Sequence, residues 1–236
     1  MESGVENAKR AVGRAAAADV PDGSRIGLGT GSTVEHLLIG LSERVREGLK
    51  VLGVSTSETT ENRARELGIE TSTLDRIDRL DLAIDGADEI DPRGAMIKGG
   101  GAAMTREKIV ARAAAEFWVI ADQKKLVDHL GQTHPLPIEV LPFGWRQTLA
   151  GLADLGLRPD LRLDDHGNPV RTDQENLVLD AALDADLTNT LESLRTLDRQ
   201  ILAIAGVVES GLFLDFRGRV YTAGHDGDVD RRNLAG

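Results

Sequence analysis

The feature that most constrains the fold of this chain is an alternation of short apolar segments with longer amphipathic ones along its first half. The apolar segments have the length of buried strands, and they lie at 25–29, 49–55, 69–73, 80–85 and 117–121. Amphipathic stretches at 5–18 and 33–47 have helical spacing. A strand–helix–strand rhythm predicts a parallel sheet with helices on both faces, in which ligands bind outside the carboxyl ends of the strands.

Local signals mark the ends of two further helices. Ser55 and Glu58 have the spacing of a capping box, and Gly68 is a plausible residue to follow the last turn of the helix that they open. Thr105 is predicted to cap a helix that runs to Glu116.

The character of the chain changes near residues 134–142, where Pro135, Pro137 and Pro142 lie close together. The order from there is a strand, a helix over 145–155, strands near 158–163 and 176–180, and a helix near 187–197. This order predicts a small, separate α+β unit. We expect the last segments, 207–215 and 219–223, to form a hairpin around Gly218.

Composition excludes several other classes of protein. Cys is absent, so neither disulfides nor thiolate metal sites are available. No apolar run is long enough to cross a bilayer, and the N-terminus lacks a signal-peptide pattern. The formal net charge of -11 argues against nucleic acid as the main partner. We therefore predict a cytoplasmic protein that binds neither nucleic acid nor membrane.

The basic residues are mostly Arg, with few Lys. An acid-rich, Lys-poor surface would suit a salt-rich cytoplasm, where screening removes self-repulsion. It is equally expected of an ordinary acidic protein from a GC-rich genome. Either way, an anionic substrate would require a locally positive site.

The first candidate site is the glycine-rich segment 27–33, between a predicted strand and a predicted helix. Its backbone N–H groups and the helix N-terminus point to one spot, which suits a phosphate, and Thr30, Ser32 and Thr33 add hydroxyl groups. A P-loop would need a Lys here, and a dinucleotide fingerprint would need a third Gly where Ser32 stands. The segment predicts a phosphate site without indicating a nucleotide, and a tight turn with capping hydroxyls is the alternative.

The second candidate is an acidic turn at the end of the strand predicted at 80–85. Asp85 and Asp88 flank two small residues, Gly86 and Ala87, which allow a ligand to approach the backbone closely. An acidic cluster can also bind a divalent cation, but no His lies nearby and a Lys follows shortly. A metal site and a solvated acidic turn remain the alternatives.

The third candidate is Lys98 with the three glycines that follow it, Gly99–Gly101. Consecutive glycines allow unusual backbone angles and expose N–H groups in a row, and the Lys supplies positive charge where a negative oxygen could develop. A plain flexible loop is the alternative.

The fourth candidate is Glu107, in the first turn of the helix that follows the glycines. A Glu able to move a proton between adjacent carbons is the central requirement of aldose–ketose isomerisation. The alternative is a carboxylate that only complements the helix dipole.

Together these motifs resemble the ribose-5-phosphate isomerase family, type A. The resemblance rests on Gly-x-Gly-Thr-Gly-Ser-Thr at 27–33, Asp-Gly-Ala-Asp-Glu at 85–89, Lys-Gly-Gly-Gly-Ala-Ala at 98–103 and Thr-Arg-Glu-Lys-Ile at 105–109. Matches at 120–122, 135–140 and 206–208 extend it over nearly the whole chain.

The resemblance implies an α/β fold, with a Rossmann-like, mostly parallel sheet domain formed by 1–132 and 206–236 and a smaller α+β, ferredoxin-like domain inserted at 133–205. It also implies interconversion of D-ribose 5-phosphate and D-ribulose 5-phosphate in the pentose phosphate pathway, without metal or organic cofactor, by a homodimer or homotetramer.

The resemblance assigns roles residue by residue. Glu107 matches the general base that moves the proton between C1 and C2. Lys98 and the backbone of Gly99, Gly100 and Gly101 match the groups that stabilise the enediolate oxygen. Asp85 and Asp88 match the acids for ring opening and hydroxyl proton transfer. Thr30, Gly31, Ser32, Thr33 and Lys125 match the phosphate-binding groups, assisted by Lys9, and Gly86 and Ala87 complete the substrate-binding set. Lys124 and Lys125 stand side by side where the family has one Lys, and the alignment favours Lys125.

Two other functions are compatible with parts of this pattern. A related sugar-phosphate isomerase or deaminase would use the same fold, but no His is placed beside the acid cluster in the sequence. A non-catalytic sugar-phosphate sensor would usually carry a DNA-binding domain and would not need Glu107.

Overall fold

The computed structural model describes residues 2–234 and divides them into two compact units. Unit 1 contains residues 2–87, 106–125 and 216–234, and unit 2 contains residues 88–105 and 126–215.

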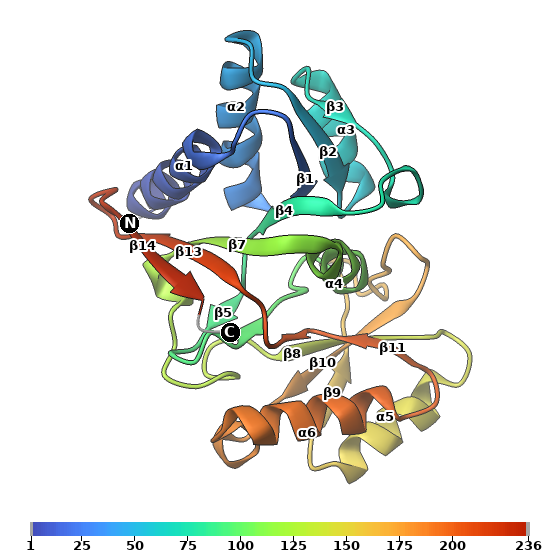
Figure 1. Cartoon of the computed structure of the whole chain (residues 1–236). Helices are drawn as coiled ribbons and strands as arrows, with labels where there is room; N and C mark the ends of the chain where they lie inside the picture. Colours follow the sequence, from blue (N-terminus) through green and yellow to red (C-terminus); the bar gives the residue numbers. More distant parts are fainter. Residues whose placement is uncertain (1, 235–236) are drawn as a thin grey trace. The chain divides into compact units, whose positions relative to one another are not determined.

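Unit 1 is built on a seven-stranded sheet with the order β14-β13-β7-β4-β1-β2-β3 (Figure 1). Neighbours from β13 to β3 are parallel, and β14 is antiparallel to β13. The strands are β1 (Ser24–Leu28), β2 (Val51–Ser55), β3 (Glu70–Thr71), β4 (Leu80–Asp85), β7 (Ala114–Asp122), β13 (Gly218–Ala223) and β14 (Val229–Leu234). The helices are α1 (Glu2–Asp19), α2 (Ser32–Arg46), α3 (Glu58–Glu66) and α4 (Met104–Ala113), with a 3₁₀ turn, η1 (Leu74–Arg76), before β4 and another, η2 (Gln123–Lys125), after β7. The parallel sheet predicted from the alternation is confirmed.

The core of unit 1 is aliphatic and lies between the central strands and the helices. Ile26 and Leu28 of β1 and Ile84 of β4 are fully buried, as are Leu37 and Leu41 on one face of α2. Figure 1 shows α1 and α2 side by side, consistent with their extensive packing. Burial of such side chains stabilises the fold by roughly 1.5–3 kcal/mol each.

The predicted ends of two helices are wrong. Ser57, and not Ser55, caps α3: its side chain accepts the N–H of Thr60 at 3.2 Å, because β2 extends through Ser55. Gly68, with φ of 78°, follows this helix as predicted. Thr105 lies inside α4 rather than capping it, and residues 114–116 belong to β7, where Ala114 and Glu116 pair with β4. Pairing with a neighbouring strand has overridden the helical propensity of these residues.

The predicted hairpin around Gly218 is also wrong. Residues 218–223 form β13, which pairs in parallel with β7 and in antiparallel with β14. The segment before it pairs instead within unit 2.

Unit 2 contains a four-stranded antiparallel sheet with the order β11-β8-β10-β9. The strands are β8 (Leu136–Val140), β9 (Arg158–Leu161), β10 (Leu177–Ala182) and β11 (Val207–Ser210); the helices are α5 (Trp145–Asp154) and α6 (Leu191–Leu202), with a 3₁₀ turn, η3 (Ala185–Thr188), before α6. The chain order β-α-β-β-α-β is that of a ferredoxin-like fold, which confirms the predicted class.

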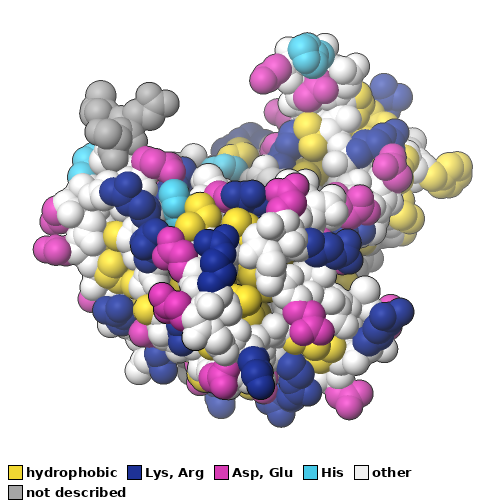
Figure 2. Space-filling model, turned by 90° about the horizontal axis from the view of Figure 1, so that it is seen from above, with side chains coloured by type: hydrophobic (Ala, Val, Ile, Leu, Met, Phe, Trp, Pro, Cys, Tyr) yellow, Lys and Arg dark blue, Asp and Glu magenta, His cyan; other side chains and the backbone are white. Residues whose placement is uncertain are grey.

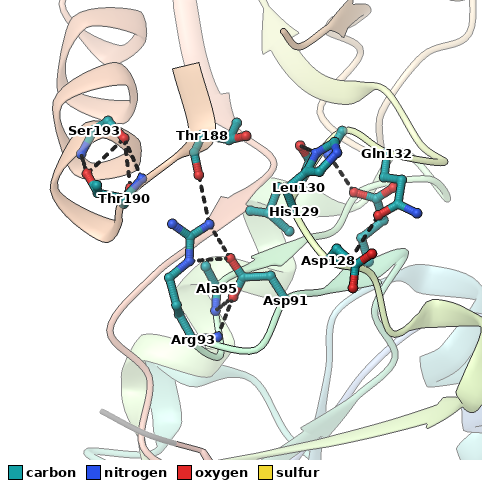
Figure 3. A network of polar contacts seen from close by, with 12 residues as sticks. Asp91, Arg93, Ala95, Asp128, His129, Leu130, Gln132, Thr188, Thr190 and Ser193 are labelled. Carbon is teal, nitrogen blue, oxygen red and sulfur yellow. Dashed lines mark hydrogen bonds and ion pairs between the residues drawn. The ribbon is translucent and has the colours of Figure 1, made fainter. Parts of the chain in front are cut away.

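A second, three-stranded sheet with the order β12-β6-β5 also belongs to unit 2. Its strands are β5 (Glu89–Ile90), β6 (Met96–Ile97) and β12 (Leu212–Phe213). The turn between β5 and β6 is held by Asp91, 1% exposed, which accepts the N–H groups of Arg93 and Ala95 at 2.9 and 3.0 Å (Figure 3). Arg93 in turn donates to the carbonyl of Thr188 at 2.8 Å, which ties the turn to η3.

The compact units divide the chain at positions other than 133 and 205. Residues 88–105, 126–132 and 206–215 lie in unit 2. They do so because β6 pairs with both β5 and β12, and β11 pairs with β8. Periodicity along one segment does not report which distant segment it pairs with.

Charged side chains of both signs are interspersed over the face drawn in Figure 2. Ion pairs in unit 1 join neighbouring helices, such as Arg14 with Glu43 and Arg63 with Glu35, each at 2.7 Å. Exposed pairs of this kind stabilise a fold by about 0–1 kcal/mol each. Across residues 2–234, no helix combines the length and apolar character that a membrane span requires.

Candidate active site

The loop between β1 and α2 has the backbone of an anion site. Gly31, the N-cap of α2, has φ of 113°, a conformation that strains any residue with a side chain. Its carbonyl accepts the N–H of Glu35 at 3.2 Å, so the preceding N–H groups of the first helical turn have no partner in the helix. Ser32 is exposed and Thr33 half-buried at this end of α2. The predicted glycine turn at a helix N-terminus is therefore present in unit 1, and a phosphate site there stays a prediction.

The Thr30 hydroxyl is engaged inside unit 1. It lies 2.8 Å from the Thr56 hydroxyl and donates to the Ser57 hydroxyl at 2.9 Å, while the Thr60 hydroxyl donates to the carbonyl of Gly29 at 2.9 Å. These neighbours were not predicted. The signal that could have found them is the run of hydroxyl residues just after β2, at the same edge of the sheet as the glycine loop.

Lys9, on α1, contacts the glycine-rich segment 27–33. Its Nζ donates to the Ser32 hydroxyl at 2.9 Å, which brings a positive charge to the N-terminus of α2. Lys125 ends η2, the turn directly after β7, and is half-buried, whereas Lys124 is exposed. β7, β4 and β1 are parallel neighbours. The turn η2, after β7, and the glycine-rich segment 27–33, after β1, therefore both lie at the carboxyl edge of the sheet. The structure thus places a Lys at each side of the Asp85 strand end.

Asp85 lies at the point where the strand order of unit 1 reverses. The chain proceeds outward from β1 through β2 to β3, then returns to β4 on the other side of β1. Ligands of such sheets bind at this switch point. Asp85, 2% exposed, accepts the N–H groups of Thr30 at 3.0 Å and Gly86 at 2.7 Å through Oδ1. Two predicted site segments therefore meet here through backbone-to-carboxylate hydrogen bonds.

Asp81 lies near the start of β4, the strand that ends at Asp85, and its contacts stabilise the sheet. It accepts the backbone N–H of Arg25 at 2.7 Å and pairs with its guanidinium at 3.3 Å. The backbone hydrogen bond, reinforced by the side-chain hydrogen bond and charge of Arg25, lowers the pKa of Asp81 below its ordinary value. This residue faces solvent at the opposite end of β4 from Asp85.

Glu107 lies in the first turn of α4 and is only 5% exposed. Burial of a carboxylate is costly unless charge or hydrogen bonds compensate it, and the role of Glu107 as a base stays a prediction. Thr105, two residues earlier, donates its hydroxyl to the buried Glu139 carboxylate in unit 2. That bond explains why Thr105 does not cap the helix.

Asp88, Lys98 and the three glycines lie together in unit 2. The Gly100 N–H donates to Asp88 Oδ2 at 2.7 Å, and a Cβ on Gly100 would lie 2.7 Å from Asp88 Oδ1. Lys98 follows β6, its backbone N–H donating to the Gly211 carbonyl at 2.9 Å. Its side chain is 2% exposed, with Nζ 5.3 Å from the centre of the Phe213 ring. One of the two predicted acids, Asp88, therefore lies in the same unit as Lys98 and the three glycines.

The predicted site residues consequently form two sets, one in each unit. Within residues 2–234, no group of three or more His, Asp or Glu side chains is arranged to hold a metal ion.

Comparison with known proteins decides the family. Residues 52–227 match the family model of ribose 5-phosphate isomerase A (phosphoriboisomerase A). The chain belongs to the ribose-5-phosphate isomerase A family. Members of this family interconvert ribose 5-phosphate and ribulose 5-phosphate, and the chain is an aldose–ketose isomerase of this kind.

Individual relatives agree over nearly the full length of the enzyme. Ribose-5-phosphate isomerase A of Thermomicrobium roseum is 46% identical over 225 residues, covering 95% of this chain and 93% of the relative. Among solved structures, ribose 5-phosphate isomerase A of Methanocaldococcus jannaschii is 37% identical with a TM-score of 0.87, covering 95% of this chain and 97% of the other. A D-ribose-5-phosphate isomerase in complex with phospho-erythronic acid is 35% identical with a TM-score of 0.90, covering 97% and 98%. The predicted family and fold class are confirmed.

Proposed function

We propose that this chain interconverts D-ribose 5-phosphate and D-ribulose 5-phosphate in the non-oxidative pentose phosphate pathway through an enediolate, with Glu107 as the base. The observation that carries the proposal is the burial of Glu107, 5% exposed, at the start of the helix that follows the Lys98 glycine loop. Glu107 removes the proton from C2 of the open-chain aldose and returns it to C1. The electron pair of the broken C–H bond forms the C1–C2 double bond, and the carbonyl oxygen at C1 becomes the oxyanion.

The residues of each unit have distinct roles in this proposal. Asp85 and Asp88 open the sugar ring and move the hydroxyl proton between O2 and O1. Lys98 and the N–H groups of the glycine loop stabilise the oxyanion electrostatically.

The phosphate is bound in unit 1 by the N-terminus of α2. The backbone of Thr30 and Gly31, the hydroxyl groups of Ser32 and Thr33, and the ammonium groups of Lys9 and Lys125 are the proposed ligands. The Lys9–Ser32 hydrogen bond at 2.9 Å supports this assignment, since it already holds one of the two charges at the helix N-terminus. A local positive site of this kind resolves the conflict between an anionic substrate and a net charge of -11.

The proposed route requires a base, two acids and an oxyanion site, all of which the chain supplies, so we propose that it needs no metal or organic cofactor. We also propose that the enzyme acts in the cytoplasm as a homodimer or homotetramer, with no nucleic-acid or membrane partner. Activity that persists with EDTA, and light scattering of the purified enzyme, would test the cofactor and the oligomeric state.

The central test is Glu107→Gln. The amide keeps the size of the side chain but cannot accept the carbon-bound proton, so we expect kcat to fall at least about 10²- to 10⁴-fold, the typical contribution of a general base. Binding of phospho-erythronic acid, measured by calorimetry, should stay within a few-fold of the parent enzyme. Exchange of the C2 proton of ribose 5-phosphate in D₂O, followed by NMR, should be lost in parallel.

Glu47→Gln is the matched control, because Glu47 is an exposed acid just beyond α2 in the same unit. It should leave kcat unchanged. Normal turnover by Glu107→Gln would show that another group is the base.

A further inference from the structure

The guanidinium of Arg162 is shared between a carboxylate and two backbone carbonyls. Arg162 directly follows β9, and its guanidinium pairs with the carboxylate of Asp180 on β10, Nε donating to Oδ2 at 2.7 Å and a second nitrogen to Oδ1. The remaining nitrogen donates to the carbonyls of both Gly99 and Gly100 at 3.0 Å each. All four residues lie in unit 2, and the Arg162 side chain is only 13% exposed.

These two carbonyl contacts determine the direction of two N–H groups. In a planar trans peptide the C=O and the following N–H point in opposite directions. Because the carbonyls of Gly99 and Gly100 point toward Arg162, the N–H groups of Gly100 and Gly101 point away from it. The Gly100 N–H bears this out, since it donates to Asp88 on that other side at 2.7 Å.

The Gly101 N–H remains available on the side away from Arg162. Within residues 2–234 it donates to no protein group, and Gly101 itself is exposed. Gly99 has φ of 99° and Ala102 has φ of 59°, so the backbone of residues 99–102 is irregular and no helix or strand hydrogen bonds fix its conformation. Glycine segments lose much conformational entropy on ordering, and the Arg162 contacts restrain this one at two consecutive peptides.

We propose that Arg162, oriented by Asp180, is a positioning residue for the isomerisation: it holds the peptides of the glycine loop so that the Gly101 N–H faces the oxyanion of the enediolate. The inference rests on the proposed role of the glycine loop in binding that oxyanion. Arg suits the task because its planar fork pairs with a carboxylate through two nitrogens and still has donors for both carbonyls. A Lys at this position has one nitrogen for four acceptors.

The test compares Arg162→Met with Arg158→Met. Arg158 is the first residue of β9, the strand that Arg162 directly follows, and it pairs with Asp184 at 2.8 Å. Its side chain is 61% exposed, and it has no contact with residues 99–101 among the described residues. We expect Arg162→Met to lower kcat roughly 10- to 100-fold, as for a displaced catalytic group, with KM for ribose 5-phosphate changed less than about threefold because the proposed phosphate ligands lie elsewhere. Arg158→Met should match the parent enzyme.

Two measurements separate positioning from a general loss of structure. Amide hydrogen exchange of the peptide that contains residues 99–101 should speed up in Arg162→Met and not in Arg158→Met. Arg162→Lys and Asp180→Asn, which are milder changes, should give intermediate values of kcat, and these variants keep the test valid if Arg162→Met folds poorly.

An unchanged kcat in Arg162→Met, or a change confined to KM, would overturn the inference. Faster amide hydrogen exchange of residues 99–101 at unchanged kcat would also overturn it, because it would show that the conformation of this loop does not affect the reaction. Neither result would touch the assignment of the base, which Glu107→Gln tests independently.

Discussion

The Asp85 carboxylate lies against the backbone of Gly29 and Thr30 with no room for a side chain between them. A Cβ built on Gly29 would lie 2.0 Å from Asp85 Oδ1 and 2.1 Å from its Cγ. Only glycine fits at position 29, because any side chain would collide with Asp85. The Asp85 carboxylate is in turn held by the N–H of Thr30 at 3.0 Å. At the scale of single residues, the glycine-rich segment 27–33 and the acidic turn therefore depend on each other for their conformation.

Gly29→Ala should disrupt this contact, because the methyl group can be accommodated only if Asp85 or the loop moves. We expect kcat/KM to fall about 100-fold, the effect of a misplacement near 1 Å, and the free energy of unfolding to fall by about 1–3 kcal/mol from overpacking. Steady-state kinetics and urea unfolding would measure both.

Gly151→Ala is the control for this substitution. Gly151 lies in α5 of unit 2, where a Cβ would approach the Ile204 side chain at 3.2 Å. Its kcat/KM should equal that of the parent enzyme. If Gly29→Ala were as active as Gly151→Ala, the contact between Gly29 and Asp85 would not matter for the site.

At the scale of elements, the docking of α1 on β13 matters for the site because α1 carries Lys9. Tyr221 of β13 is fully buried and donates its hydroxyl to Asp19, the last residue of α1, at 2.9 Å. Burial is the main cause that raises the pKa of Tyr221, and the hydrogen bond to Asp19 adds to it. The hydroxyl therefore remains protonated in the folded state at a pH where an exposed tyrosine ionises.

Tyr221 is the single tyrosine of the chain, so its ionisation can be followed directly by absorbance. We expect the titration midpoint to lie above about 10 in the folded enzyme and near 10 in urea. Because the folded-state pKa is raised, its contribution to stability is complete below pH 10 and is lost as the pH rises toward the folded pKa.

Tyr221→Phe should remove this pH dependence. It should lower the free energy of unfolding at neutral pH by about 1 kcal/mol through loss of the hydrogen bond, and stability should then fall less steeply above pH 10 than in the parent enzyme. Equal titration midpoints in the folded and unfolded states would contradict the assignment.

At the scale of the whole molecule, charge is the dominant property, with 39 acidic and 28 basic side chains. Repulsion among excess acids destabilises a compact state, and salt screens it. Local ion pairs offset part of this repulsion, but the net charge remains -11.

Raising NaCl from about 0.05 to 0.5 M at pH 7.5 should therefore stabilise the enzyme. We expect a gain of about 1 kcal/mol, equivalent to ~2–4 °C in Tm for a chain of this size. The control is the same series near pH 5.0, the sequence pI, where the net charge vanishes and the salt effect should disappear. An equal effect at both pH values would point to ion exclusion rather than to screening.

The local motifs were the most predictable parts of the chain. Segments 27–33, 85–89 and 98–101 stood out from the sequence alone, because glycine spacing and acids at a strand end affect the nearby backbone; the chemistry assigned to them stays a prediction. Element ends were less predictable: residues 114–116 have helical propensity but form part of β7, since β4 pairs with them. The contacts of Arg162 with Gly99 and Gly100 could not be predicted, because these residues are distant in sequence.

The sequence by itself was enough to identify the family and the parallel sheet, and it singled out the candidate site residues from Asp85 to Glu107, whose roles stay predictions. Periodicity and turn residues encode these features within a few residues. Only the tertiary structure decided that residues 88–105 belong to unit 2, that Asp85 is held by the Thr30 backbone, and that Arg162 restrains the glycine loop. The Asp85 and Arg162 contacts join residues 55 and 63 apart in sequence, and residues 88–105 join unit 2 through the pairing of β6 with the still more distant β12. No local pattern records which distant partner the folded chain selects.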